Sequence, residues 1–257
     1  MPILLPKLQS IAITQVPFVS HSRLLDLVEA PNLHRFFVWH DFQWNPFDST
    51  PMFESAGRFI GASRPSRGDD HTAQISIVST NDRFAAVVGD RRVVLQTCTW
   101  IQGTGQGERR AALAAVLRQF DGRLRDSIKV VQLSGLRGRE MIDLARVLNP
   151  YLPNVEELEM TVGIYSSALE GLSILGQLPS SPAEEKEAWL FPKLVGFKFG
   201  VPRGVVCDVI LEKLKARNVG QGQAIQLTIQ GGKIRRDTAD KLRTYLQALK
   251  MTGTEVA

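Results

Sequence analysis

A short phrase recurs four times in this chain and constrains its fold more than any other feature. The phrase begins with proline, which is followed by lysine or asparagine and then by leucine or valine. After two variable residues come two apolar residues with one variable residue between them. Its copies begin at Pro6, Pro31, Pro153 and Pro192. Average residue frequencies would give a chain of this length roughly 0.03 copies by chance. Such self-similarity predicts a repeat architecture.

The end of each phrase has the pattern of a β-strand. Its last two apolar residues are separated by one position, so they face the same side of a strand. The proline stands just before the strand, where its missing N–H is harmless and where a preceding helix must end. Helical patterns precede three copies, over residues 22–29, 139–148 and 182–190. The unit is therefore helix, proline and short strand, which is the unit of a leucine-rich-repeat solenoid.

Weaker copies without the proline occupy residues 72–77, 128–133 and 224–229. Together with the four full copies they predict seven strands, ending at positions 13, 38, 77, 133, 160, 199 and 229. The unequal gaps between these ends indicate an irregular array. Residues 83–98 carry two apolar arms around Gly89-Asp90, a pattern typical of a hairpin. Residues 41–70 are rich in Pro, Ser, Gly and Phe, and we expect a long surface loop there.

The predicted fold class is thus α/β. We expect an irregular, leucine-rich-repeat-like solenoid of about seven parallel strands, with helices outside and one hairpin insertion. At 257 residues the chain is long for one globular core but ordinary for a solenoid, so we expect a single domain over residues 1–257.

Several stretches also resemble the leucine-rich-repeat portion of F-box-like proteins of mushroom-forming fungi. The resemblance covers most of the chain and is carried by Leu5-Pro6-Lys7-Leu8-Gln9-Ser10-Ile11, Leu24-Leu25-Asp26-Leu27, Glu29-Ala30-Pro31-Asn32-Leu33, Leu190-Phe191-Pro192-Lys193-Leu194 and Leu211-Glu212-Lys213-Leu214-Lys215-Ala216-Arg217. An N-terminal F-box segment of the usual pattern is absent, and the chain opens directly on a repeat strand. The resemblance implies a protein-interaction module, the substrate-recognition part of a ubiquitin-ligase adaptor.

The candidate binding residues alternate with the inward apolar positions and should line the open face of the sheet. Most side chains at these positions are small or polar. Exposed aromatic residues there would be natural anchors for a partner. The alternative is that the 41–70 insertion, with Phe42, Trp44 and Phe47, folds back over the two aromatic positions. The candidate protein-binding residues are Phe37, Trp39, Gln132, Glu159 and Lys198.

Two other classes of function stay open. Residues 103–140 hold eight Lys and Arg against four Asp and Glu, in a chain whose net charge is +5. This basic stretch, residues 109–139, could bind nucleic acid, although a solvated helix face explains it as well. An enzyme would need a site in the loops at 41–70 or 102–108. We find no motif for a catalytic residue, a cofactor or a metal ion, and expect none of the three.

The first residues do not have the charged and apolar regions of a secretory signal peptide. No apolar run approaches the roughly 20 residues that a membrane-spanning helix needs. We therefore expect a cytoplasmic or nuclear protein with a protein partner, no membrane association and no small-molecule substrate. A free-standing repeat scaffold without a ligase role remains the alternative to the adaptor.

Overall fold

The computed structural model describes most of the chain and divides it into two compact units, Met1–Ile128 and Lys129–Ala257. The prediction of a single domain stays a prediction. The described residues are 3–14, 27–40, 46–61, 73–79, 83–88, 91–97, 105–134, 138–162, 168–179, 187–206, 209–221, 224–246 and 248–256.

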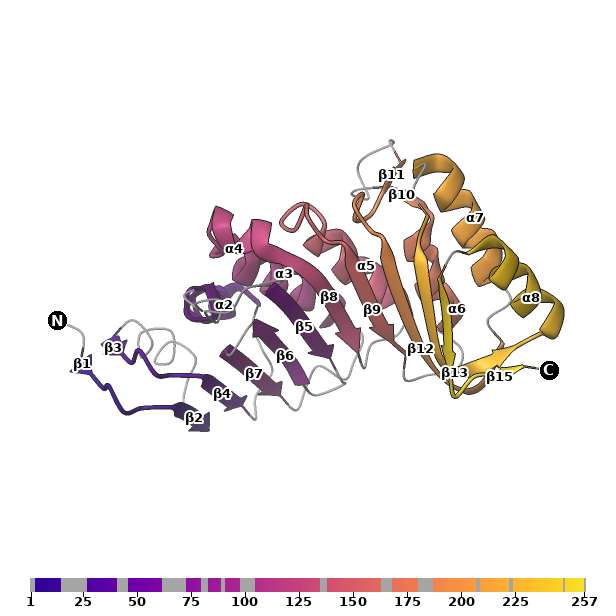
Figure 1. Ribbon diagram of the computed structural model, residues 1–257. Coiled ribbons are helices and arrows are strands. Elements are labelled where there is room, and N and C mark those ends of the chain that lie inside the picture. Colours follow the sequence, from indigo (N-terminus) through magenta and orange to yellow (C-terminus); the bar gives the residue numbers. More distant parts are fainter. Residues whose placement is uncertain are drawn as a thin grey trace. The chain divides into compact units, whose positions relative to one another are not determined.

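The first unit contains a mixed sheet (Figure 1). Neighbouring strands lie in the order β2, β4, β7, β6, β5. β2, β4 and β7 pair in parallel, whereas β6 is antiparallel to both β7 and β5. The strands are β2 (Ser10–Thr14), β4 (Arg35–His40), β5 (Ala73–Ser79), β6 (Arg83–Val88) and β7 (Arg91–Thr97), with a separate parallel pair of β1 (Ile3–Leu4) and β3 (Val28–Glu29).

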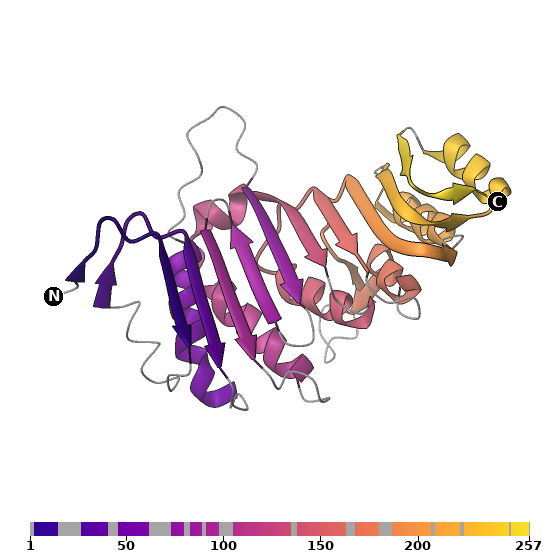
Figure 2. The same cartoon turned by 90° about the horizontal axis from the view of Figure 1, so that it is seen from below.

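The helices of the first unit are α2 (Pro46–Gly61), α3 (Gly105–Arg118) and α4 (Gly122–Ser127). Figure 2 shows α2 running along one side of the N-terminal strands. The rings of Phe59 on α2 and Phe36 on β4 have their centroids 6.4 Å apart. Helix α2 therefore covers the inward face of β4, to which the buried Phe36 points.

The second unit contains a parallel sheet in the order β8, β9, β12, β13, β14, with β15 also parallel to β13. Its strands are β8 (Ile128–Ser134), β9 (Glu157–Thr161), β12 (Gly196–Val206), β13 (Gln226–Ile234), β14 (Leu249–Thr252) and β15 (Glu255–Val256), beside an antiparallel pair of β10 (Gln177–Pro179) and β11 (Glu187–Trp189). The helical elements are α5 (Gly138–Leu148), α6 (Ala168–Gly171), the 3-10 helix η2 (Leu172–Leu175), α7 (Ile210–Gln221) and α8 (Arg236–Tyr245).

All seven predicted strands are present, and the spacing of apolar residues correctly identified their inward face. Of the inward residues, Ile11 is half-buried and the others are buried. Equivalent positions stand opposite one another, as Leu158 does with Phe197 and Phe197 with Leu227. The buried inward residues are Ile13, Phe36, Val38, Ile75, Ile77, Val131, Leu133, Leu158, Met160, Phe197, Phe199, Leu227 and Ile229.

The repeated phrase is also a repeated piece of backbone. In three copies, the leucine N–H donates to the carbonyl of the residue before the proline, which places proline at the second position of a β-turn. These bonds run from Leu8 to Leu5, from Leu33 to Ala30 and from Leu194 to Phe191.

Neighbouring copies of the phrase are joined by equivalent hydrogen bonds. The N–H groups of His34 and Arg35 both donate to the carbonyl of Gln9. Those of Val195 and Gly196 donate in the same way to the carbonyl of Glu156. The sequence repeat is therefore a structural repeat of turn and strand, within a mixed α/β fold whose strands are mostly parallel.

The predicted hairpin at 83–98 is confirmed by β6 and β7, although residue 98 lies outside the described residues. It is not an appendage, however, because β7 pairs directly with β4 and takes the place predicted for β5. Among the described strands of this sheet only β6 runs in the opposite direction, as the predicted hairpin requires, and β2, β4 and β5 share one direction as predicted. Ala85 and Ala86 are consecutive on β6 and both are buried, so this strand is covered on both faces and belongs inside a sheet.

The predicted loop at 41–70 is wrong over residues 46–61, which form helix α2. Phe53, Ala56 and Ile60 recur at helical spacing and are buried. Helix α2 packs closely on α3, since a Cβ atom at Gly57 would lie 2.5 Å from the carbonyl oxygen of Val116. The prolines and glycines of this segment made an amphipathic helix hard to recognise in the sequence. Tertiary packing stabilises this helix. Residues 41–45 and 62–70 lie outside the described residues.

The first and the third of the three helices predicted before the phrases give way to strands, although Leu27, within the predicted 22–29, is helical. Residues 28–29 form β3, which pairs with β1, and residues 187–189 form β11, which pairs with β10. Strand pairing with a distant segment outweighs local helix propensity in both places. The helix predicted at 139–148 is confirmed by α5.

The turn before β12 is held from inside the second unit by Arg217 of α7, whose side chain is fully buried. Its Nη2 atom donates to the carbonyls of Leu190, at 2.8 Å, and Phe191, at 2.7 Å. Phe191 has a positive φ of 51° and donates its N–H to Oδ1 of Asn149 at 2.7 Å. The guanidinium also lies 5.4 Å from the ring centroid of Trp189. Three side-chain hydrogen bonds thus hold a strained residue and its neighbour.

Candidate functional site

The face of the second sheet that carries the predicted binding residues is open. Along β9 the burial alternates, with Leu158 and Met160 buried and Glu157 and Thr161 exposed. The helical elements of this unit lie on the side to which the buried residues point (Figure 1). The opposite face therefore presents its side chains to solvent.

Three of the predicted residues form one row across this open face. The parallel register places Gln132 of β8 opposite Glu159 of β9, and Glu159 opposite Lys198 of β12. Thr228 of β13 continues the row beyond Lys198. The shared register of the repeats thus brings together side chains that are far apart in sequence.

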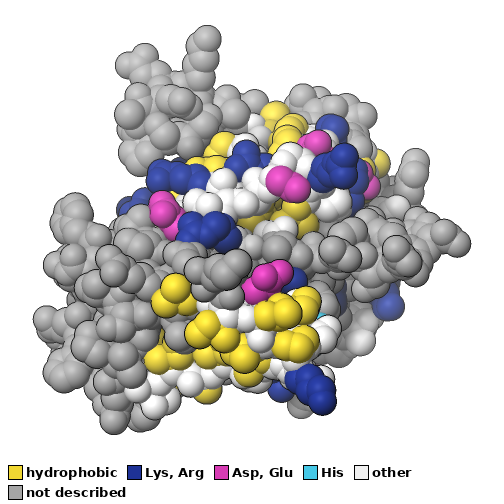
Figure 3. Space-filling model, turned by 90° about the vertical axis from the view of Figure 1, so that its left-hand side faces the viewer, with side chains coloured by type: hydrophobic (Ala, Val, Ile, Leu, Met, Phe, Trp, Pro, Cys, Tyr) yellow, Lys and Arg dark blue, Asp and Glu magenta, His cyan; other side chains and the backbone are white. Residues whose placement is uncertain are grey.

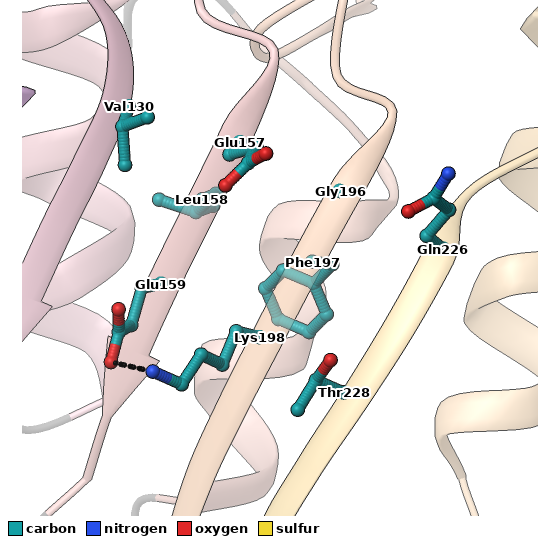
Figure 4. Close-up of a pocket in the computed structure, with 9 residues that line it drawn as sticks. All are labelled: Val130, Glu157, Leu158, Glu159, Gly196, Phe197, Lys198, Gln226 and Thr228. Carbon is teal, nitrogen blue, oxygen red and sulfur yellow. Dashed lines mark ion pairs between the residues drawn. The ribbon is translucent and has the colours of Figure 1, made fainter. Parts of the chain in front are cut away.

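A single carboxylate joins the three residues of this row. The Nζ atom of Lys198 lies 2.7 Å from Oε1 of Glu159, and Nε2 of Gln132 donates to Oε2 at 2.8 Å. Figure 4 shows the ion pair across the two strands. The side chains of Lys198 and Glu159 are 37% and 24% exposed, so solvent screens the pair and its net stabilisation is at most about 1 kcal/mol. Its main effect is to fix the orientation of both groups.

A hollow of about 210 Å³ opens beside this row. It lies over β12, between β9 on one side and β13 on the other, as Figure 4 shows. Leu158 and Phe197 are buried toward the helices, and the polar side chains stand around the opening. The lining residues are Val130, Glu157, Leu158, Glu159, Gly196, Phe197, Lys198, Gln226 and Thr228.

Glycines on β12 create this hollow. Gly196, Lys198 and Gly200 alternate along the open face, so Lys198 is the one side chain that β12 presents between residues 196 and 200. A Cβ atom at Gly196 would lie 3.0 Å from Cγ of Glu157, and one at Gly200 would lie 3.1 Å from Oγ1 of Thr161. Side chains of β9 therefore lie close beside both glycines, and Gly200 is buried whereas Gly196 is half-exposed and lines the hollow.

Sequence reasoning missed Glu157, Gly196 and Gln226, which line the hollow. They stand two residues before Glu159, Lys198 and Thr228, so the same period-2 rule places them on the open face. The predicted open face began only after the first inward apolar residue of each strand, and these three residues stand just before it.

The predicted aromatic anchors belong to the first unit. Phe37 is half-buried on β4 and stands opposite Val94 of β7, whereas the side chain of Trp39 lies outside the described residues. Because α2 packs on the face of Phe36, this helix does not cover Phe37, which points to the other side. Phe42 and Trp44 of the predicted covering segment lie outside the described residues, as does the side chain of Phe47.

Part of the basic stretch at 109–139 has structural partners. Arg125 donates to the carbonyls of Leu117 and Arg118 at the end of α3, and Lys129 pairs with Glu156 at 2.5 Å. Arg118 and Arg123 are exposed. The side chains of Arg109 and Arg137 lie outside the described residues, and nucleic-acid binding stays a prediction. Residues 105–108 of the predicted 102–108 loop form the start of α3 instead.

The N-terminal part of the first unit exposes apolar side chains. Ile3 is 61% exposed, Leu4 60% and Leu27 53%. Figure 3 faces this side of the molecule and shows hydrophobic side chains gathered in its lower part. Apolar groups exposed in this way often mark contact surfaces.

Comparison with known proteins gives no relative. No protein-family model matches the chain, and no curated protein or solved structure is significantly similar to it. Within the described ranges, no three His, Cys, Asp or Glu side chains come together to hold a metal ion. None of the described helices is both long enough and apolar enough to cross a lipid bilayer.

Proposed function

We propose that the chain is a protein-interaction module that binds its partner through the open face of the second sheet. The observation that carries this proposal is the ordered row of Gln132, Glu159 and Lys198. Their groups are oriented by one another, half-buried and adjacent to a hollow, so a partner would meet a preorganised polar surface. The opposite face of the sheet is buried in the core.

The finer form of the proposal is that the module recognises the substrate of an F-box-type ubiquitin ligase. It is supported by the resemblance of residues 5–11, 190–194 and 211–217 to that family and by the repeated turn and strand. A free-standing repeat scaffold is the alternative. The two differ in the fate of the bound partner, because only a ligase adaptor would shorten its lifetime in the cell.

Selection from a random peptide library against the purified full chain tests the binding face. We expect enriched peptides to bind Lys198→Ala and Glu159→Ala at least tenfold more weakly than the wild type. The pair Lys215 and Glu212 on α7, whose charges are 3.3 Å apart, supplies the matched control. Substituting either of these to alanine should leave binding unchanged.

Two results would oppose the proposal. One is a library that yields no specific binder. The other is a set of binders that respond to the α7 substitutions and ignore those on β9 and β12. Urea unfolding of each variant confirms that the fold is intact, since both ion pairs are partly exposed and contribute little to stability.

A further inference from the structure

The hollow over β12 has an excess of hydrogen-bond acceptors. Glu157, Gln226 and Thr228 surround it with a carboxylate, an amide and a hydroxyl group. Its lining contains two carboxylates, those of Glu157 and Glu159, against the single ammonium of Lys198. A ligand that enters it should therefore be a cation that donates hydrogen bonds.

The two carboxylates of the hollow differ in what they already bind. Glu159 accepts from both Lys198 and Gln132. Among the described residues, no side chain forms a hydrogen bond or an ion pair with the carboxylate of Glu157, which is exposed. Lys250, opposite Thr228 on β14, is exposed and does not line the hollow. The uncompensated charge of the hollow is thus that of Glu157.

The geometry around Gly196 favours a planar donor. The Glu157 side chain leans toward Gly196 from β9, since a Cβ atom on this glycine would lie 3.6 Å from Cδ of Glu157. Gln226 stands on the opposite side, on β13, as Figure 4 shows. The backbones of β9 and β13 are two strand spacings apart, roughly 9.5 Å, and the lean of Glu157 makes the gap between its carboxylate and Gln226 narrower than this. A guanidinium with hydrogen bonds of about 2.9 Å on either side spans such a gap, whereas an ammonium is a compact point charge.

We propose that this hollow is a subsite for the side chain of an arginine on the partner protein. The guanidinium lies over Gly196, donates to the carboxylate of Glu157 on one side and reaches the amide oxygen of Gln226 on the other. The neighbouring pair of Lys198 and Glu159 forms one wall. This inference rests on the proposed function, because it assigns the chemistry by which the same face recognises its partner.

A set of short peptides tests the subsite directly. The probes are acetyl-Gly-Arg-Gly-amide, the same peptide with citrulline, which is a neutral analogue of arginine, and the same peptide with lysine. Each is titrated into the isotope-labelled full chain, and the amide resonances of Gly196 and Gln226 are followed. We expect saturable shifts with the arginine peptide, and binding at least fivefold weaker with the citrulline and lysine peptides.

Two variants complete the test. Glu157→Gln keeps the shape of the side chain and should weaken binding of the arginine peptide at least fivefold. Glu255→Gln removes an exposed carboxylate of β15 outside the hollow, which pairs with Lys233, and should have no effect. The inference is overturned if the arginine peptide does not saturate, if citrulline or lysine binds equally well, or if Glu157→Gln changes nothing. If library peptides still bind this face in that case, the proposed function stands and only the arginine subsite fails.

Discussion

The guanidinium of Arg217 donates to the carbonyl oxygen of Phe191 at 2.7 Å from within the core of the second unit. This bond joins helix α7 to the turn from which β12 starts. The same turn places Gly196 and Lys198 at the start of the strand, so a buried contact on one side of the sheet positions the candidate site on the other.

Replacing Arg217 with methionine should destabilise the chain by about 2 kcal/mol. The carbonyls of Leu190 and Phe191 lose a shared donor. We expect this loss to exceed the gain from no longer burying a guanidinium whose Nε and Nη1 atoms have no hydrogen-bond partner among the described residues. Urea unfolding measures the difference. Lys215→Met, on the solvent side of the same helix, should stay within about 0.5 kcal/mol of the wild type. Equal stability of both variants would show that the contact contributes nothing.

The effect of Arg217→Met should not depend on pH between 6 and 9. Burial lowers the pKa of Arg217 from its ordinary value to about 10. Below pH 9 the group is therefore charged in the folded and the unfolded chain, and no proton is exchanged on unfolding. Above pH 10 the folded chain releases the proton first, so the wild type gains stability relative to the variant. A difference that changes steadily from pH 6 to 9 would exclude this account.

Gly231→Ala should cost about 3 kcal/mol. Gly231 has φ of 73°, and a Cβ atom there would lie 2.3 Å from the carbonyl oxygen of Val201. Backbone strain and a steric clash therefore act together. Gly253 has a similar φ of 64° but nothing within 4 Å of its Cβ position, so Gly253→Ala should show the strain alone, about 1 kcal/mol. Chemical denaturation measures the stability lost by each variant. Similar losses would mean that β12, which carries Val201, shifts to make room for the added Cβ atom.

Gly57→Ala tests the packing of helix α2 against α3. Alanine favours helix formation, but its Cβ atom would meet the backbone of Val116 at 2.5 Å, and we expect a net loss of about 2 kcal/mol. Gly122, at the start of α4, has nothing within 4 Å of its Cβ position. Gly122→Ala should leave the thermal midpoint unchanged or raise it slightly. A stabilising Gly57→Ala would mean that the two helices separate readily.

The leucine of the repeated phrase should contribute several times more to the stability of the fold than an exposed leucine nearby. Leu33 is 3% exposed, whereas Leu4 is 60% exposed. Truncating the buried residue leaves a cavity and should cost about 3 kcal/mol. Leu4→Ala should cost less than about 0.5 kcal/mol. Unfolding of both variants in guanidinium measures the two losses of stability. Comparable losses would show that the leucine of the phrase is not part of the core.

The strands were predictable from the sequence because each phrase marks its own start and its own inward face. Gln132, Glu159 and Lys198 followed from the same rule, and parallel register then made them neighbours. The order of β5, β6 and β7 was not predictable, since it depends on which of these strands pairs with β4. Helix α2 was hidden because its stability comes from burying Phe53 and Ile60 and not from local propensity.

The meander of β5, β6 and β7 has an odd number of strands. It enters at β5 and leaves at β7 in the same direction, which is also the direction of β4, because β6 alone is reversed. A hairpin added through tight turns therefore preserves the polarity of the sheet, whereas a single strand added through a tight turn would reverse the strand that follows it. Strands added through tight turns should therefore come in pairs, whereas a strand that follows a helical crossover, as β9 follows α5, can be added singly without reversing the sheet.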